Sequence, residues 1–275
     1  MKILFFRSIW GLEETPTLEA QLRKIKAGGF DGVEMAVPAD AAACREARKI
    51  IDDLGLAVIA QQCRTAGQTV AEHTAGFAAI FERALLLRPL HLNSHTGRDH
   101  FTFDQNLEIF DHAAALAAQH EVELLHETHR GRALFSAPAT ERFLVERPQL
   151  RLVADFSHWC CVHESLLADQ SGRVTRAIKH SSAIHARIGH DQGPQIPDPR
   201  DPLWQSHLDV HWAWWKKIVA QRRAEGRSVL CVTPEFGPAP YMTLLPHTHK
   251  PIADLWEINL FMRDWFKEQL TVSLA

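Results

Sequence analysis

VELLHETHRG, residues 122–131, is an apolar, strand-like run that ends in a glutamate and a histidine. The same arrangement recurs three times further along the chain, where apolar runs end in DFSHW (155–159), HAR (185–187) and PEFGP (234–238). Three carboxylates and one imidazole form a ligand set suited to one hard or borderline divalent metal ion. The residues that would supply this set are Glu127, Asp155, His185 and Glu235.

Strand-like and helix-like segments alternate along the sequence, and this alternation predicts a parallel sheet. The count is eight βα units, which favours a closed (β/α)8 TIM barrel as a single domain over residues 1–275. A doubly wound open sheet is the alternative, but no glycine-rich dinucleotide turn follows the first strand. The expected strands are 2–6, 32–35, 56–61, 90–95, 122–127, 150–156, 183–188 and 228–236, and the expected helices are 17–28, 39–54, 70–87, 104–120, 138–146, 163–179, 203–224 and 252–269.

Side chains alternate between the two faces of a strand, so residues two apart point the same way. At the carboxyl end of a barrel strand, the inward face is the active-site face. Two proline-rich stretches, 189–202 and 237–251, follow the seventh and eighth strands, where barrel enzymes place loops that cover the substrate. The residues expected to share a face are His185 with Arg187, Glu127 with His129, and His91 with Asn93 and His95.

The composition is that of an ordinary globular protein of 275 residues, with 46% apolar residues and a net charge of −3. This charge gives no electrostatic case for nucleic acid as a partner. We interpret the apolar N-terminal run as a first strand rather than a signal peptide, and no stretch reaches the roughly 20 apolar residues of a membrane span. The five cysteines are scattered and form no CxxC pair, so we expect a reduced, cytoplasmic protein.

The predicted ligand set suits Mn²⁺, Mg²⁺, Co²⁺ or Zn²⁺, and it leaves room for two further ligands on an octahedral ion. Adjacent oxygens of a polyol or hydroxy-ketone could fill those positions. The metal would polarise the carbonyl and stabilise an enediolate, while a carboxylate beside the carbon acid moves the proton. Glu127 and Glu235 come from different strands and would lie on different sides of such a substrate.

On these motifs the chain resembles the xylose-isomerase-like TIM-barrel superfamily of sugar isomerases and epimerases, over nearly its whole length. The resemblance implies that Glu127, Asp155, His185 and Glu235 bind one divalent metal ion. It also implies that the two glutamates act as the acid–base pair, and that His158 and Arg187 hold substrate oxygens. The chain departs from the better-known epimerases at Ile188, where those enzymes carry an aspartate.

We therefore expect a metal-dependent isomerase or epimerase that acts on a keto-sugar or related polyol by proton transfer through a metal-bound enediolate. A dehydratase or lyase that uses the same site is the alternative. An apurinic endonuclease is disfavoured because the loop after strand seven has no Asp-x-His pair, and a non-catalytic sugar-binding barrel is disfavoured by the intact ligand set. The expected partner is a small carbohydrate, and the superfamily suggests a homo-oligomer. Further expected substrate-binding residues are His95, Glu34 and Gln61, whereas His91 is expected in the core.

Overall fold

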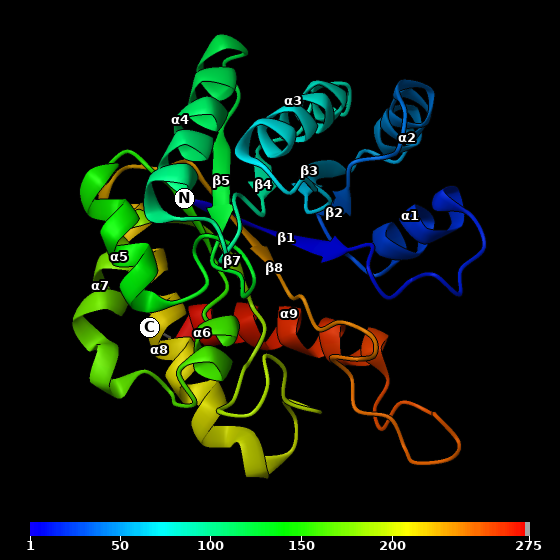
Figure 1. The fold of residues 1–275 in the computed structure, drawn as a ribbon. Helices are drawn as coiled ribbons and strands as arrows, with labels where there is room; N and C mark the ends of the chain where they lie inside the picture. Colours follow the sequence, from blue (N-terminus) through cyan, green and yellow to red (C-terminus); the bar gives the residue numbers. More distant parts are fainter. Residues whose placement is uncertain (273–275) are drawn as a thin grey trace.

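Eight parallel strands close into a barrel in sequence order, and helices surround it on the outside (Figure 1). The structure is a computed structural model and describes residues 1–272. The (β/α)8 prediction is confirmed, because each strand pairs with its sequence neighbours and β1 pairs with β8. The strands are β1 (Lys2–Ser8), β2 (Gly32–Ala36), β3 (Ala57–Gln62), β4 (Leu92–Ser94), β5 (Leu124–Glu127), β6 (Leu152–Ala154), β7 (Ser181–His185) and β8 (Val229–Thr233).

Most helices begin where a short polar side chain accepts a hydrogen bond from the first turn. Thr69 and Thr102 each form a complete capping box, with Glu72 and Gln105 as the reciprocal partners. The helices are α1 (Leu18–Ala27), α2 (Ala41–Asp53), α3 (Val70–Leu85), α4 (Phe103–Gln119), α5 (Ala137–Glu146), α6 (Ser157–Val162), α7 (Ser171–His180), α8 (Gln205–Ala224) and α9 (Leu255–Val272), with 3₁₀ turns η1 (Ala168–Gln170) and η2 (Pro202–Trp204).

One predicted helix, 163–179, is wrong in its boundaries. A short helix, α6, begins directly after Asp155 and Phe156, and the longer helix α7 starts only at Ser171. Between them Glu164 and Leu167 adopt positive φ angles of 47° and 60°. Left-handed residues cannot continue a right-handed helix, so the chain turns there before the helix restarts.

The barrel interior is filled in layers. Its apolar floor is a cluster separate from the larger core between strands and helices. Gly32 makes room for this floor, because a Cβ there would lie 2.3 Å from the ring of Phe6 and 2.5 Å from the carbonyl oxygen of Ala57. Polar side chains follow two residues later on the same strand faces, so the floor supports the site above it. The floor residues are Phe6, Ile59, Leu125, Val153, Ala183 and Cys231.

Among residues 1–272, none of the helices combines the length and apolar character needed to cross a membrane. The tryptophans of α8 pack inward, since Trp212, Trp214 and Trp215 are all buried. The prediction of one domain over residues 1–275 includes residues 273–275, which lie outside the described residues, and it stays a prediction.

Candidate metal and substrate site

Four buried side chains meet at the carboxyl ends of β5, β6, β7 and β8. Each of them offers one ligand atom, and these atoms all lie within 4.8 Å of one another. His185 is central, because its Nδ1 lies 2.8 Å from Glu235 Oε2, 3.7 Å from Glu127 Oε2 and 3.8 Å from Asp155 Oδ2. The tertiary structure therefore brings together the four residues that the sequence proposes as metal ligands. We refer to them as the quartet: Glu127, Asp155, His185 and Glu235.

Glu34, in the middle of β2, lies beneath the quartet. Its carboxylate contacts His185 Nε2 at 3.1 Å and accepts hydrogen bonds from Thr233 Oγ1 at 2.6 Å and Asn93 Nδ2 at 2.8 Å. Because Glu34 engages Nε2, the other ring nitrogen of His185 faces the carboxylates. A carboxylate that orients a histidine from behind in this way is typical of metal sites. Asn93 also donates to Glu127 Oε2 at 2.8 Å, and this contact fixes the Glu127 carboxylate.

The electrostatics of the quartet are those of crowded buried charges. Burial lowers the pKa of His185, but the charges of Glu235, Glu34 and Glu127 outweigh it, so the pKa lies well above its usual value. Burial raises the pKa of Glu127, but nearby histidines outweigh it and hold the value well below normal. For Glu235 burial dominates, and the pKa is raised. A protonated imidazole thus balances the carboxylates when no metal is bound.

Arg187, two residues beyond His185, contacts the quartet from the side on which a substrate would bind. Its guanidinium donates to Asp155 and to Ser157 Oγ at 3.2 Å, and it lies 3.4 Å from Glu235 Oε2. It also donates to His158 Nε2 at 2.8 Å. Burial lowers the pKa of Arg187, but Asp155 and Glu235 outweigh it and raise the pKa above its usual value.

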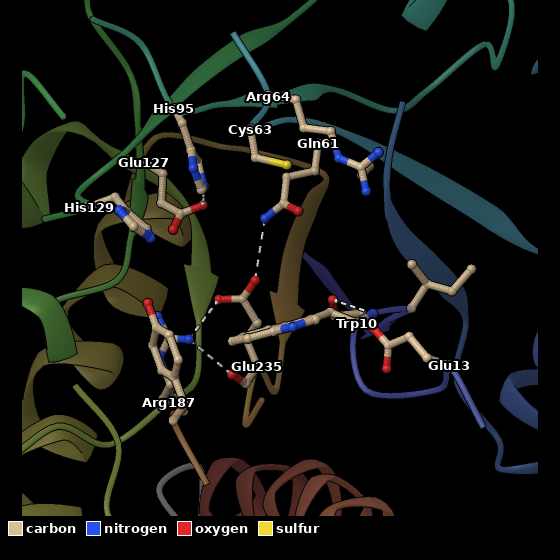
Figure 2. Close-up of a pocket in the computed structure, with 14 residues that line it drawn as sticks. Trp10, Glu13, Gln61, Cys63, Arg64, His95, Glu127, His129, Arg187 and Glu235 are labelled. Carbon is tan, nitrogen blue, oxygen red and sulfur yellow. Dashed lines mark hydrogen bonds and ion pairs between the residues drawn. The ribbon is translucent and has the colours of Figure 1, made fainter. Parts of the chain in front are cut away.

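A cavity of about 280 Å³ lies next to the quartet and is lined by two of its members, Glu127 and Glu235. Figure 2 shows Glu127 and Glu235 facing it from different strands, with Gln61 donating to Glu235 Oε1 at 3.4 Å. An aromatic wall closes one side, where the rings of Trp10 and Tyr241 meet edge to face with centroids 5.0 Å apart. The lining residues include Ser8, Ile9, Trp10, Glu13, Ala36, Gln61, Cys63, Arg64, His95, Glu127, His129, Arg187, Glu235 and Tyr241.

The structure places the other predicted substrate-binding residues at different depths. His95 and Gln61 line the cavity, as does Arg187. Glu34 and His158 are 1% and 0% exposed and do not line it. Their contacts instead orient His185 and Arg187, and we infer that their influence on a substrate is indirect.

Sequence reasoning placed His129 on the same face as Glu127 without assigning it to the site, and it missed the aromatic lining residues Trp10 and Tyr241. His129 had a usable signal, because it lies two residues beyond Glu127 on the same strand face. Tyr241 lies in the proline-rich stretch after β8, which was expected to cover the substrate. No sequence pattern predicted that Trp10 lines the cavity, because its position depends on how the β1–α1 loop folds back. Gly237 makes room for it, because a Cβ at Gly237 would lie 2.1 Å from the Trp10 ring.

The donor atoms of the quartet and their spacing suit a divalent metal ion. Nδ1 of His185 is buried and lacks a well-aligned hydrogen bond, although Glu235 Oε2 lies 2.8 Å away and two further carboxylates face it. Buried carboxylates that lie this close together repel one another unless a cation or a proton lies between them. A donor set of three oxygens and one nitrogen suits Mg²⁺, Mn²⁺, Co²⁺ or Zn²⁺. The quartet is therefore a candidate divalent-metal site.

Comparison with known proteins identifies the family of the chain. The family model described as xylose isomerase-like TIM barrel matches residues 22–248, which is most of the chain. The chain belongs to this family. No curated protein matches the chain by sequence.

Three solved structures illustrate the similarity of fold. D-psicose 3-epimerase in the presence of D-fructose superposes with a TM-score of 0.60 at 13% identity, covering 96% of this chain and 98% of that one. A probable 3-DHS dehydratase from Bacillus anthracis gives 0.59 at 14% identity, covering 86% and 94%. A xylose isomerase-like protein from Mycobacterium smegmatis in complex with magnesium gives 0.66 at 13% identity, covering 99% and 98%. Identities this low show the fold, and they leave the reaction to be argued from the site.

Proposed function

We propose that this protein is a divalent-metal-dependent isomerase or epimerase of a keto-sugar or related polyol. The observation that carries the proposal is the buried quartet next to a cavity of about 280 Å³, with Glu127 and Glu235 both lining that cavity. The fold relative seen with D-fructose supports a carbohydrate as the substrate class. A metal ion held by the quartet would supply Lewis acidity toward a substrate carbonyl.

Within this proposal the two glutamates move the proton. Glu127 lies on the β5 side and Glu235 on the β8 side, so a substrate lying between them presents one face to each carboxylate. One glutamate removes a proton from the carbon beside the carbonyl, and the other returns a proton to the opposite face. Such a transfer inverts one centre. If the proton returns to the former carbonyl carbon instead, and a hydroxyl proton shifts from the neighbouring oxygen to the former carbonyl oxygen, the carbonyl moves by one position.

Three further side chains prepare the cavity for a polyhydroxylated ligand. Arg187 and His95 are both buried at the cavity wall, so hydroxyl groups can contact them without competition from bulk water. The guanidinium of Arg187 is held by Asp155, Ser157 and His158, so it offers the substrate a fixed positive charge at the cavity wall. The aromatic ring of Trp10 offers an apolar face that packs against the carbon side of a sugar ring.

The test is hydrogen exchange at carbon. Purified protein loaded with Mn²⁺ is incubated in D₂O with a panel of unphosphorylated ketopentoses and ketohexoses, and deuterium uptake beside the carbonyl is followed by NMR. We expect uptake into substrate or product with at least one sugar, and its loss by a factor of 10³ or more in Glu127→Gln and in Glu235→Gln, on the order of what a general base contributes.

Glu13→Gln is the matched control, because Glu13 also lines the cavity but lies outside the quartet. It should retain exchange. Metal-loaded protein that exchanges no sugar of the panel, or a Glu235→Gln variant with near-normal turnover, would refute the proposal.

A dehydratase is the second candidate, and the dehydratase among the fold relatives favours it. One glutamate would remove the proton, and the other would protonate the hydroxyl group on the next carbon, which leaves as water. Mass spectrometry of the product separates the two candidates, because isomers keep the substrate mass and an elimination product is lighter by one water.

A further inference from the structure

The two arginines that line the cavity, Arg64 and Arg187, differ in whether their charge is balanced. The guanidinium of Arg187 donates to Asp155 and lies 3.4 Å from Glu235 Oε2, so two carboxylates share its charge. The side chain of Arg64 forms no hydrogen bond or ion pair with any other of residues 1–272. Figure 2 shows the two guanidinium groups on different sides of the cavity. The guanidinium of Arg64 is therefore free to bind a ligand.

The backbone on either side of Arg64 is held by two neighbouring loops. Arg132 Nη2 donates to the carbonyl oxygen of Cys63 at 3.1 Å, and Arg98 Nη2 donates to that of Thr65 at 2.8 Å. The side chain of Arg64 is exposed, but the segment that carries it is fixed by these contacts. An arginine on an unsupported surface loop has no such anchors. The anchors therefore favour a guanidinium that is placed beside the cavity over one that is merely solvated.

This arrangement gathers positive charge at one sector of the rim. Burial lowers the pKa of Arg132 and the charge of Arg98 lowers it further, so that nearby acids such as Glu127 and Asp99 do not restore it. Nη1 of Arg132 is also buried without a hydrogen-bond partner. Across residues 1–272, none of Arg64, Arg98 and Arg132 forms an ion pair with a carboxylate. Like charges held this close destabilise the fold, and a bound anion would relieve their repulsion.

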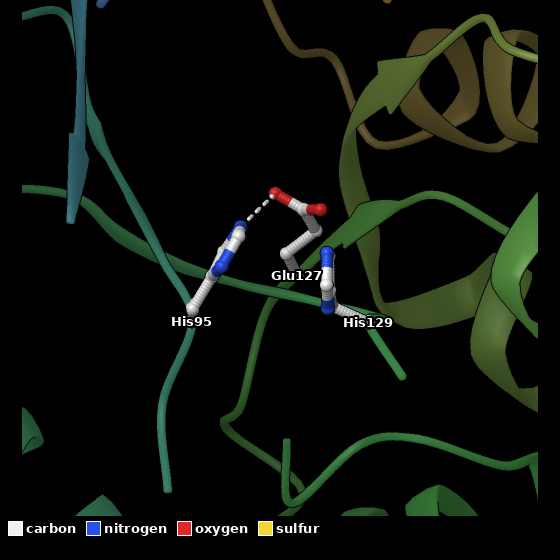
Figure 3. A group of neighbouring side chains, drawn as sticks. All are labelled: His95, Glu127 and His129. Carbon is white, nitrogen blue, oxygen red and sulfur yellow. Dashed lines mark hydrogen bonds and ion pairs between the residues drawn. The ribbon is translucent and has the colours of Figure 1, made fainter. Parts of the chain in front are cut away.

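The remaining polar groups of the cavity do not compete for such an anion. Figure 3 shows His95 and His129 on either side of the Glu127 carboxylate, with His95 Nε2 3.0 Å from Glu127 Oε2. Both imidazole rings thus lie beside an acid of the quartet. Glu13 lines the cavity outside the quartet, and its carboxylate accepts from a backbone N–H at 3.1 Å without pairing with Arg64. An anionic group on a bound ligand would therefore find its partner at Arg64.

We propose that Arg64 binds an anionic end group of the substrate, a carboxylate or a phosphate, so that the protein prefers a charged sugar to a neutral one. This inference rests on the proposed function, because it names the substrate class of the same cavity. The planar guanidinium presents parallel N–H groups, which match the oxygens of either anion. Arg64 lies outside the quartet, so the group that it binds takes no part in the proton transfer. Neutral sugars still bind, but more weakly.

The test compares three ligands that differ in one end group, namely ribitol, D-ribonate and D-ribitol 5-phosphate. None of them has a ketone or aldehyde group, so isothermal titration calorimetry on the Mn²⁺-loaded protein measures binding without turnover. We expect at least one anion to bind about 10-fold more tightly than ribitol at low ionic strength, on the scale of a charge-assisted hydrogen bond. Added salt should reduce this preference, because Arg64 is exposed. The tighter of the two anions identifies the end group as carboxylate or phosphate.

Two variants assign the preference to one side chain. In Arg64→Gln the Kd of the preferred anion should rise to that of ribitol. Arg45→Gln is the matched control, because Arg45 is also exposed but lies on α2 outside the cavity, and it should keep the preference. The rise in Tm on addition of Mn²⁺ shows that each variant is folded around the quartet. If the anion binds the metal instead of Arg64, the preference survives in Arg64→Gln, and this result would overturn the inference.

The inference and the proposed function fail in different ways. Equal Kd values for ribitol and both anions would overturn the inference and leave the proposed function standing. A preference for an anion that Arg64→Gln removes, in a protein that exchanges deuterium into no keto-sugar, neutral or charged, would support the anion site and refute the proposed reaction. Binding of none of the three ligands would overturn both.

Discussion

The variant Glu235→Gln distinguishes between two roles of Glu235, that of a metal ligand and that of a structural ion-pair partner. A glutamine keeps the size of the side chain and an oxygen that can accept from Gln61, but it removes the negative charge that lies 2.8 Å from His185 Nδ1. If Glu235 is a ligand, the variant loses the response of the protein to metal. If Glu235 only balances His185 and Arg187, the variant loses stability with or without metal.

The expected change in Tm follows from the thermodynamic linkage between metal binding and folding. A metal ion at about 1,000 times its Kd stabilises the folded chain by about 4 kcal/mol. For a chain of this size each kcal/mol raises Tm by about 2–4 °C, so the wild type should gain roughly 8–16 °C. Loss of one ligand should weaken binding by at least about 100-fold, which is about 2.7 kcal/mol and leaves a gain of roughly 3–6 °C.

The assay is thermal unfolding followed by circular dichroism, with chelator and then with Mn²⁺ at one fixed concentration. In chelator we expect the Tm of Glu235→Gln to equal or exceed that of the wild type, because one charge leaves a cluster of three carboxylates within 4.8 Å of one another. Glu13→Gln, at an acid that lines the cavity outside the quartet, should keep the full metal response. An undiminished response in Glu235→Gln, or a large loss of Tm in chelator, would refute the reasoning.

Two other predictions concern the aromatic wall and acid stability. Gly237→Ala should displace Trp10 and raise KM several-fold at unchanged metal content, whereas Gly172→Ala, where a Cβ meets nothing within 4 Å, should leave KM unchanged; an unaltered KM in Gly237→Ala would count against Trp10. Burial lowers the pKa of His73 to about 4 from 6.5. Between these two pH values the unfolded chain binds a proton at His73 and the folded chain does not. The free energy of unfolding therefore falls by up to about 3 kcal/mol as the pH drops from 6.5 to 4. In His73→Phe, the free energy of unfolding measured with urea should depend less on pH between 6.5 and 4. Phenylalanine can replace the ring, because both ring nitrogens of His73 lack partners and the ring packs edge-on against Phe101. An equally steep fall in the variant would contradict this.

The sequence by itself determined the barrel and the positions of the quartet. Both rest on short-range rules, namely the alternation of strand-like and helix-like segments and the two-residue period of a strand. Because the carboxyl ends of barrel strands converge, residues at successive strand ends such as Glu127 and His185 had to lie close together. The closed barrel and the family are confirmed, and the roles of the site residues stay predictions.

Only the tertiary structure decided the depth and the walls of the site. Glu34 and Gln61 are both on inward strand faces, yet Glu34 lies beneath His185 and Gln61 lines the cavity, because depth in a barrel depends on the stagger between strands. Trp10 and Tyr241 come from loops far apart in sequence, and their contact depends on how both loops fold over the barrel. A local pattern contains no information about such long-range packing, so the quartet could be predicted from the strands whereas the shape of the cavity above it could not.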